Sequence, residues 1–542
     1  MLRFENLSGD ASLEWTGRAA SEILSRSLAG VMSGPVLHSA ALARAAATLG
    51  SEPSTAPGIS SEPADARLAG ATRIITGYLQ KAGSGIRVEA SERDLTSQKT
   101  VRSVAAEDST PVRAIAALAR QLSSSALPYV TSDANAVRLY ATGLESPGSD
   151  AELEQAVAAD PKFGPAWAAL VTRQLARGDR DAARETIAKS SRYHLDDYDQ
   201  ATIDAAKATL NNDRHARVKA LRRISALSPG DAVLLRTVAQ SEMDEGAFAN
   251  AASDWNKLAA VLPNDANAWN LFGYSLAYAG DYKGALKAIQ EYQRLDPRGA
   301  NPLDSIGDVQ FLFRKFQEAA GSYLAANTNN PEFMNHGELY KAAWARYYAG
   351  DKSGAESLFG QFRSAREKAH DATAPLFVAD WLYRTGRSAD GIALLRTEAQ
   401  KDSAAKPLVY SQLAIWDLLA GDRPAAARDA ASAGTPQSLP VLLARFCSLP
   451  PASAEQWRER AETMIQGDGA ANLRLLALGY ALVLDGKSAE AIPVWQQIVD
   501  KSPATDFFVR AVLSKLEGQP VKRPIVPSPA EMNEFAAVLD RL

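Results

Sequence analysis

The sequence has very few of the side chains that support redox and metal chemistry. Its 542 residues include one cysteine, Cys447, and five histidines. A single cysteine excludes an intramolecular disulfide and a zinc site built on several thiolates, and it fits a reducing compartment. His194 and His215 are 21 residues apart in separate predicted helices, and no two histidines have metal-binding spacing. We therefore expect neither a metal site nor a cofactor.

Neither charge sign dominates, and long apolar runs are missing. Lys and Arg number 59 against 63 Asp and Glu, a net charge of −4. Nucleic-acid binders need a basic face, so none is expected here. No uninterrupted apolar run approaches the roughly 18 residues of a membrane span, and the residues after Met1 are too polar for a signal peptide. As written, the chain is predicted to be cytoplasmic; a periplasmic or extracellular location stays open if Met1 is not the native start.

The sequence motifs of common enzymes are also missing. There is no P-loop, no kinase-like glycine loop and no G-x-S-x-G elbow. Asp196, Asp197 and Asp199 form an acidic cluster, which we interpret as a solvated helix N-terminus, with a cation site as the alternative. Cys447 is predicted to pack as a small apolar residue rather than to react. We expect that the chain is not an enzyme.

What the sequence does contain is a regular period. Pro229, Pro263, Pro297 and Pro331 follow one another in steps of 34 residues, and Pro161 lies two such steps before Pro229. A length of 542 residues is too great for one compact core. A 34-residue period is typical of a helix-turn-helix repeat that builds its core by stacking.

The clearest unit runs from 266 to 299. It places large residues at three- and four-residue spacing, a small residue against them, a glycine between the helices and a proline after the second helix. These are Trp269, Phe272, Gly273, Leu276, Gly280, Tyr282, Ala285, Ile289, Tyr292 and Pro297. Large residues at this spacing bury one helix face, and glycine allows the positive φ at the helix end.

This pattern closely resembles the tetratricopeptide repeat. The resemblance implies a mainly α fold, a right-handed superhelical solenoid of about ten to eleven units over 130–515, clearest over 164–333. Later units keep a turn glycine, at Gly350, Gly386, Gly421 and Gly486, each followed five residues later by a small residue.

Residues 1–125 lack the repeat and predict a small α/β domain. Strands are expected at Leu2–Leu7, Pro35–His38, Thr72–Leu79, around Ile86–Ala90 and at Val101–Ala105. Helices are expected at Asp10–Leu28, Ala40–Leu49, Ala64–Gly70 and Pro111–Leu122. The segments Phe4–Asp10, Gly70–Gly77 and Ile86–Glu89 resemble a TolB-type amino-terminal domain. Such domains precede tetratricopeptide arrays in bacterial signalling proteins that carry a kinase, cyclase or winged-helix module upstream.

The last segment, 516–542, is predicted to be a linker followed by a helix. Ser528 and Glu531 form a capping box with Pro529 at the first helical position. Phe535, Val538 and Leu539 share one face of this helix. It is expected to cap the last repeat, or else to act as a docking peptide.

In this repeat family the first helix of each unit usually lines a concave groove. Projecting the repeat places amides, carboxylates and aromatic rings there, a mixture that can stack on a peptide while bonding its backbone. The same rings could instead pack against neighbouring helices. The candidates are Asn267, Asn270, Tyr274, Tyr278, Asp304, Asp308, Phe311, Tyr340, Trp344, Tyr347 and Tyr348. Asp304 and Asp308 favour a neutral or basic ligand.

Two functions from different classes follow. The first is a non-catalytic scaffold that binds a protein or peptide partner along the groove, in bacterial signalling or assembly. The second is a structural protein that self-assembles into an oligomer or filament. A variant of the first is the sensory portion of a larger kinase- or cyclase-linked protein.

Overall fold

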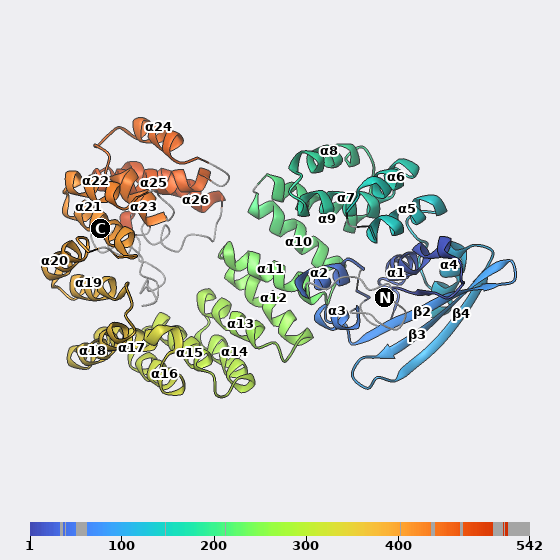
Figure 1. Cartoon of the computed structure of the whole chain (residues 1–542), viewed down its shortest axis with the longest axis horizontal. Coiled ribbons are helices and arrows are strands. Elements are labelled where there is room, and N and C mark those ends of the chain that lie inside the picture. The colour runs from blue at the N-terminus through green and yellow to red at the C-terminus, as the bar shows by residue number, and fades with distance from the viewer. Residues whose placement is uncertain are drawn as a thin grey trace. The chain divides into compact units, whose positions relative to one another are not determined.

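The computed structural model is mainly helical, with one small sheet near the N-terminus (Figure 1). It describes residues 1–32, 36–37, 39–49, 62–146, 148–211, 213–401, 403–434, 439–466, 470–501, 513 and 515–518. The predicted capping helix with Phe535 lies outside these residues. The chain divides into two compact units, which we treat separately. Unit 1 comprises 1–242 and 253–268, and unit 2 comprises 243–252 and 269–542.

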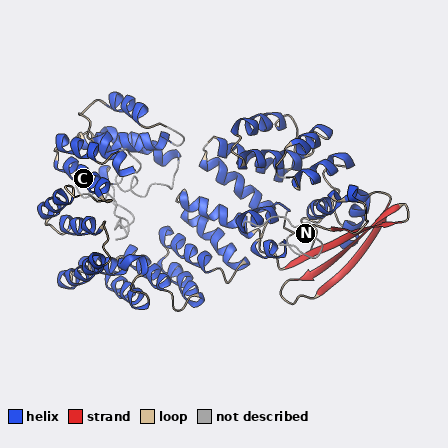
Figure 2. Ribbon diagram, viewed as in Figure 1, coloured by secondary structure: helices blue, strands red, loops and turns tan. Residues whose placement is uncertain are grey.

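Unit 1 begins with a four-stranded sheet in the order β1-β2-β3-β4 (red in Figure 2). β1 (Glu5–Asn6) is parallel to β2 (Arg73–Ala82), and β2, β3 (Gly85–Asp94) and β4 (Thr100–Asp108) form an antiparallel meander. The first helices are η1 (Ala11–Leu13), α1 (Trp15–Ser27), α2 (Ser39–Leu49), α3 (Glu62–Leu68) and α4 (Pro111–Leu122). The predicted strands of the meander are confirmed. Val36 and Leu37, however, belong to no strand.

One face of this sheet is buried beneath α1 and α4. Ile86, Val88 and Ala90 alternate inward along β3 and join the apolar side chains of both helices. Alternation of this kind is what a half-covered strand requires. Helix α4 begins where the Thr110 side chain accepts a hydrogen bond from the Arg113 backbone and Pro111 occupies the first turn.

From residue 134 onward the chain is an array of helices. They are α5 (Ala134–Leu144), α6 (Ala151–Ala159), α7 (Gly164–Ala176), α8 (Arg180–Ser190), α9 (Asp197–Leu210), α10 (Arg214–Leu227), α11 (Ala232–Asp244), α12 (Phe248–Val261), α13 (Ala266–Ala279), α14 (Tyr282–Leu295), α15 (Ala300–Leu312) and α16 (Phe316–Asn329). After η2 (Phe333–His336) come α17 (Gly337–Tyr348), α18 (Lys352–Lys368), α19 (Ala374–Arg384), α20 (Ser388–Glu398), α21 (Lys406–Ala420), α22 (Arg423–Ser432), α23 (Leu439–Cys447), α24 (Ala454–Met464), α25 (Ala470–Leu484) and α26 (Ser488–Lys501). Successive helices pack pairwise in α5/α6, α7/α8, α9/α10, α15/α16, α17/α18, α19/α20, α21/α22 and α25/α26.

The turns between consecutive helices of the array follow the glycine prediction. Gly280 has φ +92°, and the next residue, Asp281, caps α14 by accepting a hydrogen bond from the Gly284 backbone. The other predicted turn glycines, Gly350, Gly386, Gly421 and Gly486, also have positive φ, and so do Gly178 and Gly246 between earlier helices. Arg314 stands where the next repeat would carry glycine and still adopts φ +59°. Position in the repeat, rather than residue type, therefore sets the turn.

Within unit 1, buried ion pairs join the sheet-bearing segment to the array. Arg26 on α1 pairs with Asp196 and Asp199 at the start of α9, each at 2.5 Å. Arg44 on α2 pairs with Asp231, whose side chain is fully buried. Asp196 and Asp199 were expected to be solvated, but Asp199 is only 1% exposed. The solvated interpretation is therefore wrong for Asp199, because Gly164 at the start of α7 lies against it and the Arg26 side chain of α1 supplies the neutralising cation.

Over the described residues, none of the helices combines the length and apolar character needed to cross a bilayer.

Candidate partner-binding face

The predicted binding residues come from equivalent positions of successive first helices. Asn270, Asp304 and Tyr340 are separated by 34 and then 36 residues, as are Tyr274, Asp308 and Trp344. The structure confirms that they lie on α13, α15 and α17. We call the predicted residues on these three helices the first-helix face.

Four members of the first-helix face are core residues. Asp304, Phe311, Tyr340 and Trp344 are 4%, 1%, 3% and 1% exposed. They lie between helices and not on an open surface, because neighbouring first and second helices cover them. This corrects the expectation that they present their side chains to a ligand.

The other members reach solvent to different degrees. Asn267 is exposed and Tyr348 is 38% exposed. Half-buried positions are held by Asn270, Tyr274, Tyr278, Asp308 and Tyr347. The surface that the face offers is thus smaller than predicted, because three of its seven aromatic rings are buried in the core.

The charge of Asp304 and Asp308 is compensated within the chain. The Lys341 ammonium on α17 lies 2.5 Å from an Asp304 carboxylate oxygen and 3.0 Å from one of Asp308. The Lys341 and Asp304 side chains are 4% and 6% exposed. Burial by itself lowers the pKa of Lys341, but the two carboxylates raise it above its ordinary value. The lysine is therefore charged, and these aspartates no longer favour a basic ligand.

Two tyrosines complete the coordination of Asp308. Tyr323 on α16 and Tyr274 on α13 each donate their hydroxyl to an Asp308 carboxylate oxygen at 2.9 Å. The Lys341 ammonium also lies 5.4 Å from the centre of the Tyr323 ring. Charge-assisted bonds of this kind are stronger than neutral ones. They connect α13, α15, α16 and α17 through one carboxylate.

Glu338 is the acid member of this cluster. Its side chain is fully buried beside Asp304, one turn before Lys341 on α17. Burial, and then the Asp304 charge, raise the pKa of Glu338 to about 9, while burial and Asp308 raise that of Asp304 to about 6. At neutral pH Glu338 is therefore protonated, beside the carboxylate of Asp304. We call Asp304, Asp308, Glu338, Lys341, Tyr274 and Tyr323 the polar cluster.

The raised pKa of Glu338 makes stability depend on pH. A carboxyl group with a raised folded pKa stabilises fully below its unfolded pKa, about 4.5, and this contribution is lost as pH rises towards 9. Glu338→Gln keeps the shape of the side chain and a hydrogen-bond donor, but it removes the titrating proton. We expect its unfolding free energy, relative to the unaltered chain, to be higher at pH 9 than at pH 5 by at least about 1.4 kcal/mol, the equivalent of one pKa unit. Urea unfolding at both pH values measures this.

The matched control is Glu318→Gln, at an exposed glutamate of α16. Its difference from the unaltered chain is expected to be the same at both pH values. If the unfolding free energies of Glu338→Gln and the unaltered chain also differed by the same amount at pH 5 and pH 9, Glu338 would not be protonated in the folded state.

A second cluster, of aromatic rings, surrounds α17. Trp344 and Trp381 lie 4.5 Å apart between ring centres, and Trp381 stacks on Phe359 at 4.5 Å and 5°. The Tyr340 hydroxyl donates to Asp380 at 3.1 Å. Large interlocked rings leave α17 little freedom to move relative to α18 and α19.

The rim of this aromatic cluster is where the face meets solvent. Tyr348 stacks over Phe316 at 5.5 Å, and its hydroxyl accepts a hydrogen bond from Arg384 at 3.3 Å. The Arg384 guanidinium also lies 4.4 Å from the Trp344 ring centre and 3.5 Å from Asp380. Tyr348 is therefore held in one orientation while more than a third of it remains accessible.

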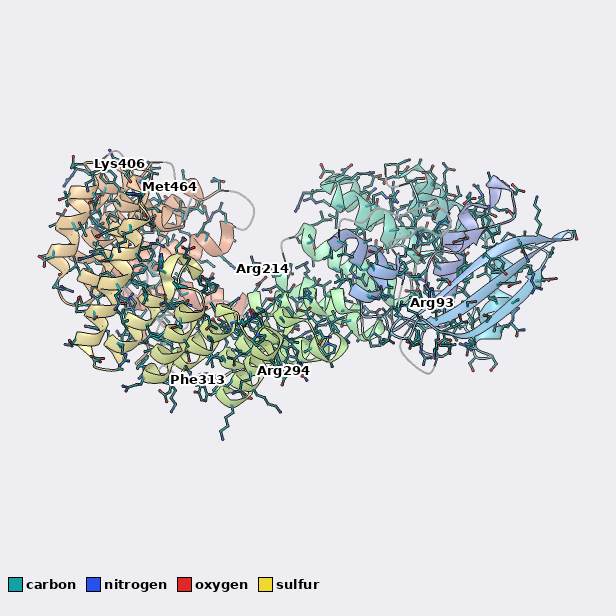
Figure 3. The ribbon with its side chains drawn as sticks, turned by 60° about the horizontal axis from the view of Figure 1, so that its bottom comes forward. Arg93, Arg214, Arg294, Phe313, Lys406 and Met464 are labelled. Atoms are coloured by element: carbon teal, nitrogen blue, oxygen red, sulfur yellow. The ribbon has the colours of Figure 1, made fainter. Side chains whose placement is uncertain are left out.

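A similar aromatic rim belongs to α13. Tyr278 packs on Tyr274 at 6.3 Å and on Phe248 at 4.9 Å between ring centres. Asn270, one turn before Tyr274, has a buried side-chain oxygen without a hydrogen-bond partner. On the second helix of the same repeat, Tyr282 contacts Phe313, which Figure 3 labels.

Three residues of this region were not predicted: Lys341, Glu338 and Arg384. Lys341 occupies the position of Ser305 and Leu271 in the two preceding repeats. A lysine at a position otherwise small or apolar was the available signal for a buried cation. No sequence signal identifies Arg384, because its partners Trp344 and Tyr348 lie on another helix pair.

The described residues contain no group of histidine, cysteine or carboxylate side chains that could hold a metal ion. Cys447 is buried in an apolar cluster, and burial raises the pKa of its thiol to about 12. A thiol with so high a pKa is a poor nucleophile.

No family model matches the chain, and no curated protein matches it. Solved structures similar to part of it include a MamA protein, at TM-score 0.28 and 18% identity over 32% of this chain and 92% of that one. A tetratricopeptide repeat protein from Parabacteroides merdae ATCC 43184 gives 0.32 and 14% over 47% and 99%. Naa15/Naa10 bound to HypK gives 0.36 and 12% over 71% and 66%. Likeness at this level carries no conclusion about what this chain binds.

Proposed function

We propose that the protein is a non-catalytic scaffold that binds a protein segment across the accessible part of the first-helix face in unit 2. The observation that carries the proposal is the set of partly accessible tyrosines Tyr278, Tyr347 and Tyr348, each fixed by neighbouring rings. Rigid aromatic side chains provide large contact area at little cost in conformational entropy, and they are enriched among the residues that dominate binding.

The chemistry of this surface favours an uncharged, aromatic or aliphatic segment. Lys341 neutralises Asp304 and Asp308, and Arg384 is already paired with Asp380. The tyrosine hydroxyls and the side-chain amide of Asn270 would bond the backbone of such a segment. An acidic or basic partner gains nothing from charges that are already paired.

The wider assignment rests on the sequence. We infer that the array is a right-handed tetratricopeptide solenoid, supported by the 34-residue spacing and by the positive φ of the turn glycines. The meander of β2, β3 and β4 with helix α4 is compatible with the TolB-type resemblance of residues 1–125. A role in bacterial signalling or assembly follows from that resemblance alone.

Affinity capture with variants of the full chain tests the proposal. Tyr278→Ala and Tyr348→Ala each remove an accessible ring, and we expect each to weaken capture of a specific partner at least tenfold. The matched control is Tyr282→Ala, in the same repeat as Tyr278 but on its second helix. A partner recovered equally by all three variants would show that binding occurs elsewhere.

A further inference from the structure

Among the residues that the structure describes, no strand pairs with the outer edge of β4. In the sheet order β1-β2-β3-β4, β4 has one neighbouring strand, β3. None of its nine residues is buried, whereas every second residue of β3 from Ile86 to Glu92 is. Within the described residues, the backbone of β4 makes no hydrogen bond beyond its pairing with β3. Arg93 on β3, labelled in Figure 3, lies near the hairpin that leads into β4.

Hairpin geometry determines which backbone groups point outward. The two-residue turn between β2 and β3 makes Ala82 and Gly85 a hydrogen-bonded pair. Because such pairs alternate, even-numbered residues of β3 bond to β4, and Arg102, Val104, Ala106 and Asp108 of β4 bond back. The N–H and C=O groups of Ser103, Ala105 and Glu107 are therefore directed away from the sheet.

From Arg102 to Asp108 this edge lacks the usual protection against pairing. Natural edge strands carry lysine, proline or a bulge, or are very short. The outward-directed residues of this part of β4 are a serine, an alanine and one glutamate. That glutamate, Glu107, is already paired with Arg87 at 2.8 Å. The pairing with β3 skips Val101, so β4 has a bulge at its start and is regular from Arg102 onward.

We propose that β4 pairs antiparallel with β4 of a second copy of this chain, around a twofold axis at Val104. In this register Ser103 lies opposite Ala105 of the second copy, and Ala105 lies opposite Ser103. The outward groups of these residues then meet and make about four backbone hydrogen bonds. Two sheets become one continuous sheet.

The strand is complementary to itself in this register, which favours a second copy over an unrelated strand. No two like charges lie opposite each other: Arg102 faces Ala106, and Ser103 faces Ala105. Arg102 is also diagonal to Asp108 of the second copy, within reach of a long side chain. The interface is separate from the first-helix face, so each can fail without the other.

A cysteine pair tests the register. At the axis, Val104 would face Val104 of the second copy in a non-hydrogen-bonded pair with Cα atoms about 4.5 Å apart, which suits a disulfide. Val104→Cys is expected to give a covalent dimer on mild oxidation of the full chain. Ala106→Cys lies two residues along the same face. It would place the Cα atoms of the two cysteines roughly 13 Å apart, so this variant is expected to remain uncrosslinked. Equal crosslinking of both variants, or of neither, would overturn this register.

A proline tests the edge independently of any crosslink. The Ala105 N–H points outward, so Ala105→Pro removes a bond to the second copy but none to β3. We expect sedimentation equilibrium to show a dimer for the unaltered chain and at least tenfold weaker association for Ala105→Pro, with an unchanged circular dichroism spectrum. A monomer at all concentrations of the unaltered chain, or a dimer indifferent to Ala105→Pro, would overturn the proposal.

Discussion

Replacing Lys341 with methionine is expected to lower the unfolding free energy of unit 2 by about 3–5 kcal/mol. Methionine has nearly the length of the lysine stem, so the substitution removes the charge and little volume. It removes the ammonium that lies 2.5 Å from Asp304 and 3.0 Å from Asp308. The site is buried, since the Lys341 side chain is 4% exposed. A buried carboxylate without a partner costs far more than the net gain from a buried ion pair. Urea unfolding followed by circular dichroism measures the loss.

Two further variants separate this cause from general damage. Lys287→Met removes an exposed lysine from α14 and is expected to change the free energy by less than about 0.5 kcal/mol. Lys341→Met combined with Asp304→Asn removes one of the stranded charges and is expected to recover part of the loss. If the double variant were less stable than the single one by the full cost of Asp304→Asn alone, the two residues would not be coupled.

The architecture of the array could be predicted because residues within each repeat determine where its helices begin and end. Proline after a second helix and glycine between helices act within a few residues, and Gly280 shows both the expected turn and the expected φ. The closeness of the two helices was also predictable from small residues. At Gly307 a Cβ atom would lie 2.5 Å from the Tyr323 ring, so only glycine fits.

The exposure of the candidate face could not be predicted in the same way. Repeat position places Asp304 and Asp308 on the correct side of α15, but it does not say what the next repeat brings against them. Lys341 is 37 residues from Asp304, and a shift of two residues between repeats puts it there. The interpretation of Asp304 and Asp308 as ligand-facing failed because their cation comes from within the chain.

The same limit applies over longer distances in unit 1. Asp199 looked like one of three solvated carboxylates at a helix start, and its cation, Arg26, is 173 residues earlier. Helix-terminal acids are stabilised by the helix dipole whether or not they are solvated. The local sequence is therefore the same whether a helix-terminal acid is solvated or buried. The Arg26 side chain of α1 decides between them, and α1 belongs to a segment outside the repeat pattern.

Replacing Arg26 with methionine is expected to destabilise unit 1 by about 3–5 kcal/mol at pH 8, as for other broken buried pairs. The Arg26 and Asp199 side chains are 9% and 2% exposed, and their atoms lie 2.5 Å apart. Arg26 also holds Asp196 at 2.5 Å. The matched control is Arg184→Met on α8, whose pair with Asp181 is largely exposed, and its effect is expected to stay within about 0.5 kcal/mol.

The loss from Arg26→Met should grow with pH, and the sign follows from Asp199. Burial raises the pKa of Asp199 to about 7 although Arg26 opposes the shift. At pH 5.5 the folded chain therefore holds much of this carboxyl protonated, and the missing arginine costs less. Without Arg26 the pKa of Asp199 in the folded chain rises further. The unfolding free energy of the variant therefore continues to fall as pH increases beyond 7, whereas that of the unaltered chain no longer changes. Arg26→Met combined with Asp199→Asn is expected to remove this pH dependence; if the dependence persisted in the double variant, a different titrating group would be responsible.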